Sequence, residues 1–313
     1  MEDLVLNALS SDGLSRAEAV FRLAFGTFVG APEPESFFSD RDFIRSRHRA
    51  THVAAFAAKV DGEIVGTSFA TDWGSVGVLG PLSVHPDFQG HGVARALMSR
   101  TMEQFDTWGT RHVGLFTFAD SAKHLALYQK SGFHARFLTA VMSKAVLPDP
   151  QAKWSRFSSL PLHLRDEVLR SCRAACGSVL AGLDLSDEIT STIDQELGEV
   201  VLIEDGSGIA AFGICHFGPA SEAGADACYV KFGLSSAGPL ADRNFSALLD
   251  GCEALASSVG MPNLLAGANL GRVRAYQELV ARGFRTVVQG VAMHRNNDPA
   301  YSVADAYVLD DWR

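Results

Sequence analysis

The residues best suited to chemistry lie in one loop, Gln89-Gly90-His91-Gly92-Val93-Ala94, which joins an expected strand to an expected helix. Alternating apolar residues predict the strand over Val76–Val84, and helical spacing begins at Val93. The first backbone N–H groups of a helix have no partner inside it, and glycines let a phosphate approach them closely. The residues by themselves therefore predict a pyrophosphate-binding loop.

Two other phosphate-binding patterns fit this loop less well. A P-loop requires lysine and then serine or threonine after its last glycine, whereas Val93 and Ala94 follow Gly92. A dinucleotide fingerprint, which would predict an NAD-dependent enzyme, requires a third glycine where Arg95 stands. The structural alternative is an ordinary strand-to-helix turn that uses its glycines for geometry alone.

A second candidate for chemistry is Tyr128, which stands four residues before Gly132-Phe133 on a helix expected over residues 122–131. A phenol with a pKa near 10 stays neutral at pH 7 and can protonate a thiolate as it forms. The structural alternative is a ring that packs on a sheet, as many aromatic side chains do.

The loop, the preceding Val84-His85-Pro86 and the Tyr128 motif resemble the GNAT superfamily of acyl-CoA-dependent N-acetyltransferases. The resemblance implies that Tyr128 is the general acid toward the departing CoA thiolate. It further implies pantetheine contacts at Leu82, Ser83 and Val84, and CoA pyrophosphate contacts at Gln89, Gly90, His91, Gly92, Val93 and Ala94. Ser121 departs mildly from the family, which often has an asparagine near the pantetheine arm at this position.

An N-acetyltransferase also needs a route for the proton of the acceptor, because an alkylammonium must lose a proton before its nitrogen attacks a thioester. Asp72 and Asp120 are carboxylates at strand ends near the expected acceptor side. Each is better explained as a surface turn residue, and a chain of water molecules is a further route for the proton. The sequence therefore assigns no base.

The composition indicates which broad classes of protein this chain can and cannot belong to. The chain has 313 residues, 47% hydrophobic and 20% charged, which predicts two soluble globular domains. No apolar run approaches the roughly 18 residues of a membrane span, and Met1-Glu2-Asp3 does not resemble an export signal, so we expect a cytoplasmic protein without a membrane partner. The net charge of -9 argues against nucleic acid, and five cysteines without a C-x-x-C pair argue against a metal.

The first half of the chain predicts an α/β fold. A helix over 14–25 and a second helix near 40–49 precede strands over 53–60 and 64–71, which meet at an Asp61-Gly62 turn. The basic residues of 41–49 are expected on the polar face of the second helix. The order continues with the strand, loop and helix described above, a strand over His112–Thr117, the Tyr128 helix and a strand that starts at Gly132-Phe133.

The second half repeats this order after a proline-rich break at 147–151, and Gly283-Phe284 matches Gly132-Phe133. We therefore expect two tandem GNAT-like domains, each a mixed, mostly antiparallel central sheet flanked by helices. The predicted domains are a GNAT-like acetyl-CoA-binding catalytic domain over 1–147 and a degenerate GNAT-like domain over 148–313.

The second copy lacks the chemical motifs. Pro239 stands in its loop, Leu279 replaces the tyrosine, and Tyr276 lies one helical turn away. Near its last helix, Asn269, Arg272 and Arg274 could bind an anionic group, and residues 301–313 are expected to add a strand or cover a sheet edge.

These observations predict an N-acetyltransferase that uses acetyl-CoA and no metal, and that transfers the acetyl group to a primary amine by direct attack in a ternary complex. The net charge slightly favours a cationic small molecule as the acceptor, through long-range steering. The alternative is a non-catalytic acyl-CoA-binding or regulatory module, in which the degenerate copy mediates formation of a homodimer.

Overall fold

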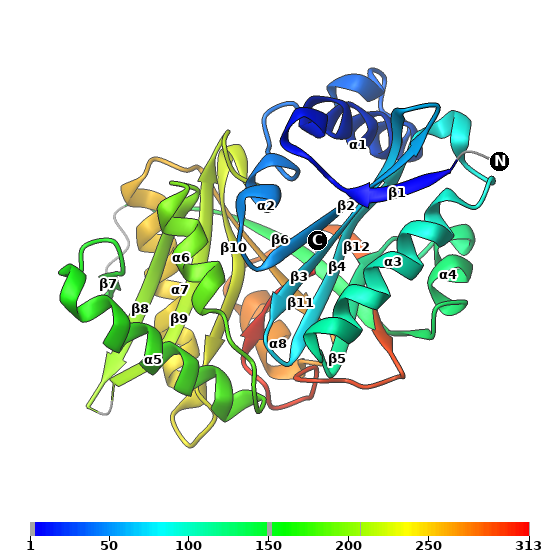
Figure 1. Ribbon diagram of the computed structural model, residues 1–313. Helices are drawn as coiled ribbons and strands as arrows, with labels where there is room; N and C mark the ends of the chain where they lie inside the picture. The colour runs from blue at the N-terminus through cyan, green and yellow to red at the C-terminus, as the bar shows by residue number, and fades with distance from the viewer. Residues whose placement is uncertain (1–3, 149–151, 207, 313) are drawn as a thin grey trace.

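The computed structural model describes residues 4–148, 152–206 and 208–312, in two halves with the same order of elements (Figure 1). The first half comprises β1 (Val5–Ala8), α1 (Leu14–Val29), α2 (Arg45–Arg49), β2 (Val53–Val60), β3 (Glu63–Trp73), β4 (Val76–Val84), α3 (Val93–Trp108), β5 (His112–Thr117), α4 (Ala122–Gln129) and β6 (Phe133–Ala145). The second half comprises β7 (Ser155–Arg156), α5 (Leu162–Val179), α6 (Ser186–Asp194), β8 (Gly198–Asp205), β9 (Gly208–Gly218), β10 (Gly224–Ser235), α7 (Ala241–Ser258), β11 (Asn263–Asn269), α8 (Val273–Ala281), β12 (Arg285–Arg295) and β13 (Val308–Leu309).

Local sequence explains most element boundaries. The β2–β3 hairpin turns at Asp61 and Gly62, whose φ angles of 51° and 84° lie in the left-handed region that this turn requires. The helix expected near 40–49 is shorter than predicted. Asp42 accepts the backbone N–H groups of Ile44 and Arg45 at 3.1 and 2.8 Å and therefore caps α2 just before its first residue.

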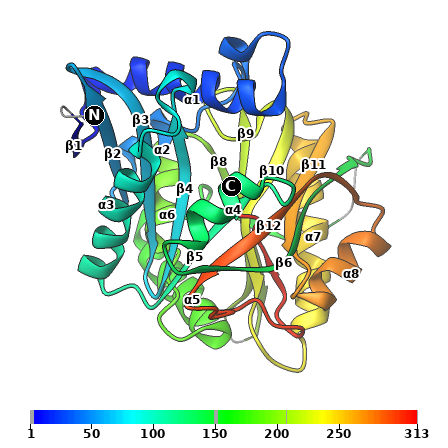
Figure 2. The same cartoon turned by 90° about the vertical axis from the view of Figure 1, so that its right-hand side faces the viewer.

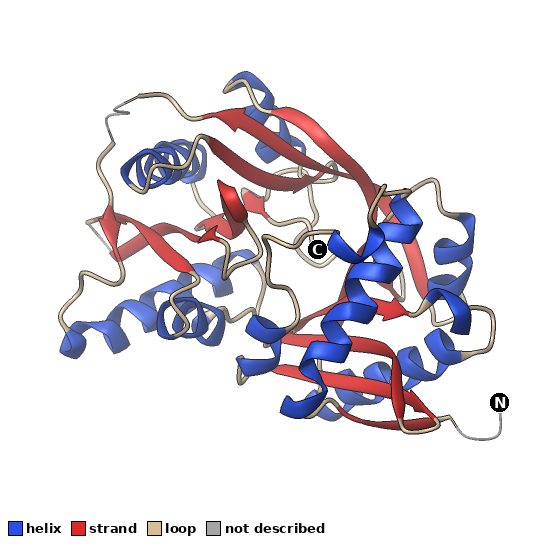
Figure 3. Ribbon diagram, turned by 90° about the horizontal axis from the view of Figure 1, so that it is seen from above, coloured by secondary structure: helices blue, strands red, loops and turns tan. Residues whose placement is uncertain are grey.

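Helices cover both faces of the strands in each half (Figure 3). In the first half α1 packs against the face that carries Phe69, and α3 packs against the face that carries Val65. In the second half α5 and α6 cover one face, and α7 covers the other. Each half is thus a three-layer α/β unit with a buried sheet.

The two halves exchange their last strands, and the result is one continuous sheet. Strand β6 of the first half pairs with β11 of the second half, while β12 of the second half pairs with β5 of the first. The two exchanged strands also pair with each other and lie side by side between the halves (Figure 2). The strand order is β1-β2-β3-β4-β5-β12-β6-β11-β10-β9-β8-β7, and β13 pairs with β10.

The predicted tandem fold is confirmed, but the exchange was not foreseen from the sequence. The break expected at 147–151 includes residues 149–151, which lie outside the described residues. The boundary between the predicted domains 1–147 and 148–313 therefore stays a prediction. In the structure, each half contributes a strand to the sheet of the other half.

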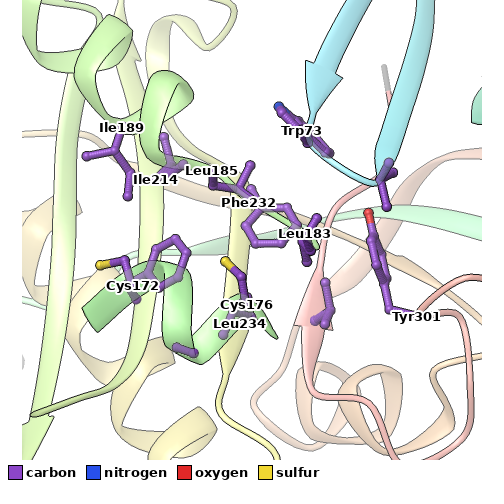
Figure 4. Packing of buried hydrophobic residues seen from close by; sticks show 14 of the residues in the cluster. Trp73, Cys172, Cys176, Leu183, Leu185, Ile189, Ile214, Phe232, Leu234 and Tyr301 are labelled. Atoms are coloured by element: carbon purple, nitrogen blue, oxygen red, sulfur yellow. The ribbon is translucent and has the colours of Figure 1, made fainter. Parts of the chain in front are cut away.

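Hairpins from each half also contact the helical face of the other half. The β3–β4 turn bridges Gly74 to Leu183 between α5 and α6, and the β9–β10 loop accepts the Asp42 N–H at the Ser221 carbonyl. Trp73 packs edge-on against Phe232, with ring centroids 5.4 Å apart, in a cluster that joins both halves (Figure 4). The contact surface therefore has an apolar core.

A group of buried charges lies beside this apolar core, and we call it the junction charges: Arg47, His52, Glu188, Glu222 and Lys231. The Arg47 guanidinium donates to both oxygens of Glu222 at 2.8 and 3.0 Å. The Lys231 ammonium lies 2.7 Å from Glu188 and 3.2 Å from Glu222, and His52 Nε2 lies 3.0 Å from Glu188. The expectation that the basic residues of 41–49 form the polar face of a helix is therefore wrong for Arg47, which is buried against the second half.

The segment that follows β12 is also built into the junction. It adds the short strand β13, as expected for residues 301–313. Asp310 binds the buried Arg272 guanidinium through both oxygens at 2.9 and 3.0 Å. The Trp312 ring lies on Gly114 of β5, where a Cβ would come within 2.1 Å of it. Gly114 is thus needed to seat this ring.

We expect Arg47→Met to lower the free energy of unfolding by about 3 to 5 kcal/mol, because Glu222 would lose its closest cation inside the protein. Urea unfolding followed by circular dichroism measures the loss. The matched control is Arg45→Met on the same helix, since Arg45 pairs with Glu18 at a partly exposed site and should cost at most about 1 kcal/mol. Equal losses in the two variants would contradict the importance of the junction charges.

The junction charges should also make the protein sensitive to acid. Burial alone would raise the pKa of Glu222, but the charges of Arg47 and Lys231 outweigh burial and lower the pKa from 4.5 to about 2. The stabilisation is therefore complete above pH 4.5 and is lost as the pH falls toward 2. Urea midpoints between pH 6 and 3 should fall less steeply for Glu222→Gln than for the unmodified chain. An identical slope would show that Glu222 is not linked to folding.

Candidate functional site

The loop at the start of α3 has the conformation that its glycines predict. Strand β4 ends at Val84 and α3 begins at Val93, and Gly90 and Gly92 have φ angles of 82° and 87°. A side chain is strained in this left-handed region, so glycine is required at both positions. Among the described residues, no hydrogen bond occupies the backbone N–H groups of Gly90, His91 or Gly92. These amides are therefore available to a ligand at a helix N-terminus.

Side chains tie this loop to its neighbours. Gln89 Nε2 donates to the Val84 carbonyl at 3.2 Å, and Lys123 Nζ of α4 donates to Gln89 Oε1 at 2.7 Å. Val93 is buried and anchors the first turn of α3, while His91 is exposed and Ala94 is half-buried. Lysine and exposed backbone amides at a helix N-terminus attract anions through the helix dipole and the side-chain charge.

Strand β4 leaves part of one edge without a strand partner. It pairs with β3 along most of its length, but its pairing with β5 covers Val76–Val78 and stops there. The N–H of His85 donates to Val65 of β3, and successive residues of a strand turn their polar groups to opposite edges. Leu82 and Val84 therefore present their backbone toward the unpaired edge.

Ser83 is placed differently from Leu82 and Val84. Its backbone faces β3, and its buried hydroxyl shares a 2.9 Å hydrogen bond with Thr67. Of the three residues that the sequence places at the pantetheine arm, Leu82 and Val84 thus have suitable backbone groups. The side chain of Ser83 stabilises the sheet instead.

Strand β4 also contains a bulge just before these residues. The register with β3 shifts between Leu79 and Leu82, so Gly80 and Pro81 have no paired residue opposite them. The Gly80 carbonyl accepts a hydrogen bond from Arg47 Nη1 at 2.6 Å. The bulge therefore connects the end of the unpaired edge to the junction charges.

Tyr128 lies where β4 and β5 stop pairing. Its ring is 8% exposed and belongs to a cluster that includes Leu79 of β4 and Leu115 of β5. Burial raises the pKa of Tyr128 to about 12, so the phenol is neutral at pH 7. Lys123 contacts the loop from the first turn of α4, and Tyr128 lies further along the same helix, so α4 spans from the loop to this cluster.

The other candidates near Tyr128 have structural roles. Ser121 caps α4 and accepts the His124 N–H at 3.4 Å. Asp72 accepts the Gly74 N–H at 2.8 Å in the β3–β4 turn, and burial raises its pKa. Asp120 is exposed.

The second copy holds no matching arrangement in its described residues. Leu279 is buried in the core, Tyr276 packs at the edge of the same core, and Pro239 lies just before α7. The expectation of an anion site is not supported, because Arg272 is paired with Asp310 and Arg274 with Asp305. The Asn269 side chain accepts the Gly271 N–H at 2.8 Å.

The described ranges contain no group of three or more His, Cys, Asp and Glu side chains that could hold a metal ion. None of the helices in these ranges is long and apolar enough to cross a membrane.

Sequence reasoning missed the residues of the junction. Two small cavities lie between the halves, and both are lined by Arg47 and Lys231. Arg47 and Glu222 are 175 positions apart, and no local pattern signals that they meet.

Comparison with known proteins agrees with this geometry. Residues 17–133 match the model of the acetyltransferase (GNAT) family. The chain is 29% identical over 94 residues to an acetyltransferase of Sodalis glossinidius and 37% identical over 73 residues to an acetyltransferase of Pectobacterium atrosepticum. These matches cover 30% and 23% of this chain, and the chain spans 66% and 52% of the length of the two relatives.

Solved structures with a similar fold cover almost the whole chain. A candidate acetyltransferase of Pyrococcus horikoshii has a TM-score of 0.67 at 12% identity, over 100% of this chain and 96% of its own. A tandem GNAT protein from the clavulanic acid biosynthesis pathway has a TM-score of 0.53 at 13% identity, over 93% and 97%. Residues 17–133 therefore belong to the GNAT acetyltransferase family, and the chain as a whole has the fold of a tandem GNAT protein.

Proposed function

We propose that this protein is an N-acetyltransferase that transfers the acetyl group of acetyl-CoA to a primary amine of a small molecule. One observation carries the proposal. The free amides at Gly90–Gly92 follow the unpaired edge of β4 at Leu82 and Val84, and the Leu82 side chain packs against the cluster that holds Tyr128.

The loop and the unpaired edge of β4 each suit one part of acetyl-CoA. The loop amides and Lys123 would hold the pyrophosphate, because they place hydrogen-bond donors and positive charge at a helix N-terminus. The backbone of Leu82 and Val84 would pair with the amides of the pantetheine arm, as a strand would. The fit is favourable because nothing lies within 4 Å of a Cβ at Gly90, which leaves the backbone open.

The proposed chemistry is direct transfer in a ternary complex. The amine lone pair attacks the thioester carbon, a C–N bond forms and the C–S bond breaks. Backbone amides of β4 would stabilise the oxyanion. Tyr128 gives its proton to the departing sulfur and regains one from solvent, while the product amide loses the extra amine proton. Because the pKa of Tyr128 is about 12, proton transfer must accompany C–S cleavage rather than precede it.

Gly92→Glu should abolish binding of acetyl-CoA, because a carboxylate would stand where the pyrophosphate is expected. We expect the affinity measured by calorimetry to fall at least about 100-fold. The matched control is Gly283→Glu in the second half, since Gly283 has a φ of 88° against 87° for Gly92; a Cβ would meet nothing within 4 Å at Gly283 and only Arg95 Nη2, at 3.5 Å, at Gly92. NAD serves as the control ligand. Unchanged affinity in Gly92→Glu would remove the loop from the binding site.

Tyr128→Phe should lower kcat on the order of 100-fold and leave the affinity for acetyl-CoA within about twofold, because it removes the proton donor and keeps the buried ring. The matched control is Tyr276→Phe on the corresponding helix of the second half, which should keep full activity. Full turnover in Tyr128→Phe would exclude the phenol as general acid. Tight acetyl-CoA binding without turnover on any amine would favour a binding or regulatory module.

A further inference from the structure

The unpaired edge of β4 has a counterpart in the second half, on β10. Strand β4 pairs in parallel with β5 from Val76 onward, and β10 pairs in parallel with β11 from Ala227 onward, 151 positions later. In each half this pairing stops while the longer strand, β4 or β10, continues. Residues of β10 can therefore be matched to residues of β4 at this offset.

The backbone of β10 is oriented like that of β4 at the matching residues. At the same offset, Gly233 and Ser235 correspond to Leu82 and Val84. The N–H of the residue after Ser235 donates to a carbonyl of β9, as the N–H of the residue after Val84 donates to a carbonyl of β3. Ser235 and Val84 therefore both turn their backbone groups to the opposite edge, toward β11 or β5.

In the second half a segment of the same chain lies on this edge, and we call residues 307–312 the strap. The N–H of Ser235 donates to the Tyr307 carbonyl at 3.0 Å, and Gly233 is the antiparallel partner of Leu309 in β13. Strand β13 also contacts β11, so the strap lies at both strands that have stopped pairing. Extended backbone thus occupies the position that the proposed function gives to the pantetheine arm in the first half.

Buried side chains hold the strap in place. Asp310 binds the Arg272 guanidinium through both carboxylate oxygens, and Arg272 precedes α8 as Ser121 precedes α4. Ser121 is the residue that the sequence places near the pantetheine arm. Asp311 accepts the Tyr229 hydroxyl of β10 at 2.9 Å. Ionic and hydrogen-bond contacts therefore fix the strap to the second half.

The second half has the edge but no matching loop for a pyrophosphate. The residue that corresponds to Gly90 is Ala241, which is already the first residue of α7. Gly233 and Ser235 are buried, and buried backbone groups without a partner destabilise a fold. The strap supplies these partners from the same chain.

The strap also reaches the first half through Trp312. The ring lies on Gly114 of β5, and Gly114 is the partner of Val78 in the last residue pair between β4 and β5. The indole N–H donates to the Tyr301 hydroxyl at 2.9 Å, which fixes the ring in the cluster that includes Val78. Beyond this residue pair the unpaired edge of β4 begins. The strap therefore holds a ring against the place where β4 and β5 stop pairing.

We propose that the strap takes the place of the pantetheine arm in the second copy, which closes this copy to acyl-CoA, and that it positions the site of the first copy through Trp312. The ring fixes the last paired residues of β4 and β5, and thereby the spacing of these strands beside the unpaired edge. Trp312 is a positioning residue because it acts through β5. The inference rests on the proposed function and adds a part of the second copy on which that function depends.

Hydrogen exchange of the unmodified protein tests the first part of the inference. Without ligand, the Val84 amide should exchange at least about tenfold faster than the Ser235 amide, because Ser235 donates to the strap and Val84 faces the unpaired edge. Both residues are buried, which makes the comparison a matched one. Acetyl-CoA should slow exchange at Val84 and reduce the difference. Equal exchange of the two amides in the free protein would overturn the inference.

Substitutions of Trp312 test the second part by calorimetry with acetyl-CoA. Trp312→Ala should weaken binding at least about tenfold, and Trp312→Phe, which keeps a ring on Gly114, should stay within about threefold of the unmodified chain. Trp154→Ala is the matched control, because Trp154 packs in the core beside α7 of the second half. It should destabilise the protein and leave the affinity unchanged.

Circular dichroism establishes which variants are folded. Full affinity in folded Trp312→Ala, or an equal loss of affinity in Trp154→Ala, would overturn the positioning role. If Trp312→Ala does not fold, Trp312→Leu replaces it, because leucine keeps apolar volume beside Gly114 without a flat ring. Full affinity in that variant would overturn the role equally.

Failure of the inference can be told apart from failure of the proposed function. If acetyl-CoA binds and Gly92→Glu abolishes this binding, the proposed site stands, and the exchange rates and Trp312 variants then decide the inference alone. Two acetyl-CoA molecules per chain would overturn the closure of the second copy. Absence of acetyl-CoA binding would overturn the proposed function, and the positioning role of Trp312 with it.

Discussion

The exchange of β6 and β12 determines how the rest of this molecule is arranged. A strand in the interior of a sheet needs backbone partners on both edges, and each of these strands finds them across both halves. Neither half can then form its complete sheet without the other. The exchange therefore holds the halves at a fixed distance and orientation.

The junction charges follow from this arrangement. Bringing the halves together buries Arg47 and Lys231 with Glu188 and Glu222, and such burial is tolerated because each carboxylate has more than one cationic or hydrogen-bonding partner. The charges balance, and the cavity beside them is neither strongly acidic nor strongly basic.

The two copies thus have different parts in the proposed function. The first copy supplies the loop at Gly90 and Gly92, the edge at Leu82 and Val84, and the phenol of Tyr128. The second copy supplies no matching loop or tyrosine among its described residues, but its Glu222 and Glu188 pair with Arg47 and His52 of the first copy.

The sequence predicted the elements because their signals are local. The Asp61-Gly62 turn and the Gly90–Gly92 loop follow from backbone conformations that few residues other than glycine adopt easily, and the apolar periodicity of β4 and α3 follows from burial on one face. The sequence predicted a longer helix, near 40–49, than the observed α2. The difference was missed because the Asp42 side chain binds the backbone at the start of α2, and the spacing of apolar residues gives no information on such a hydrogen bond.

The sequence by itself determined the order of the elements, the α/β class and the place of the loop and of Tyr128, since each depends on residues within about one turn or one strand. The tertiary structure alone decided the strand exchange, the burial of Arg47 and the orientation of Ser83 toward β3. These depend on contacts between residues up to 180 positions apart. Such contacts form because the total free energy of packing, hydrogen bonding and charge interactions favours them. A short stretch of sequence does not determine that total.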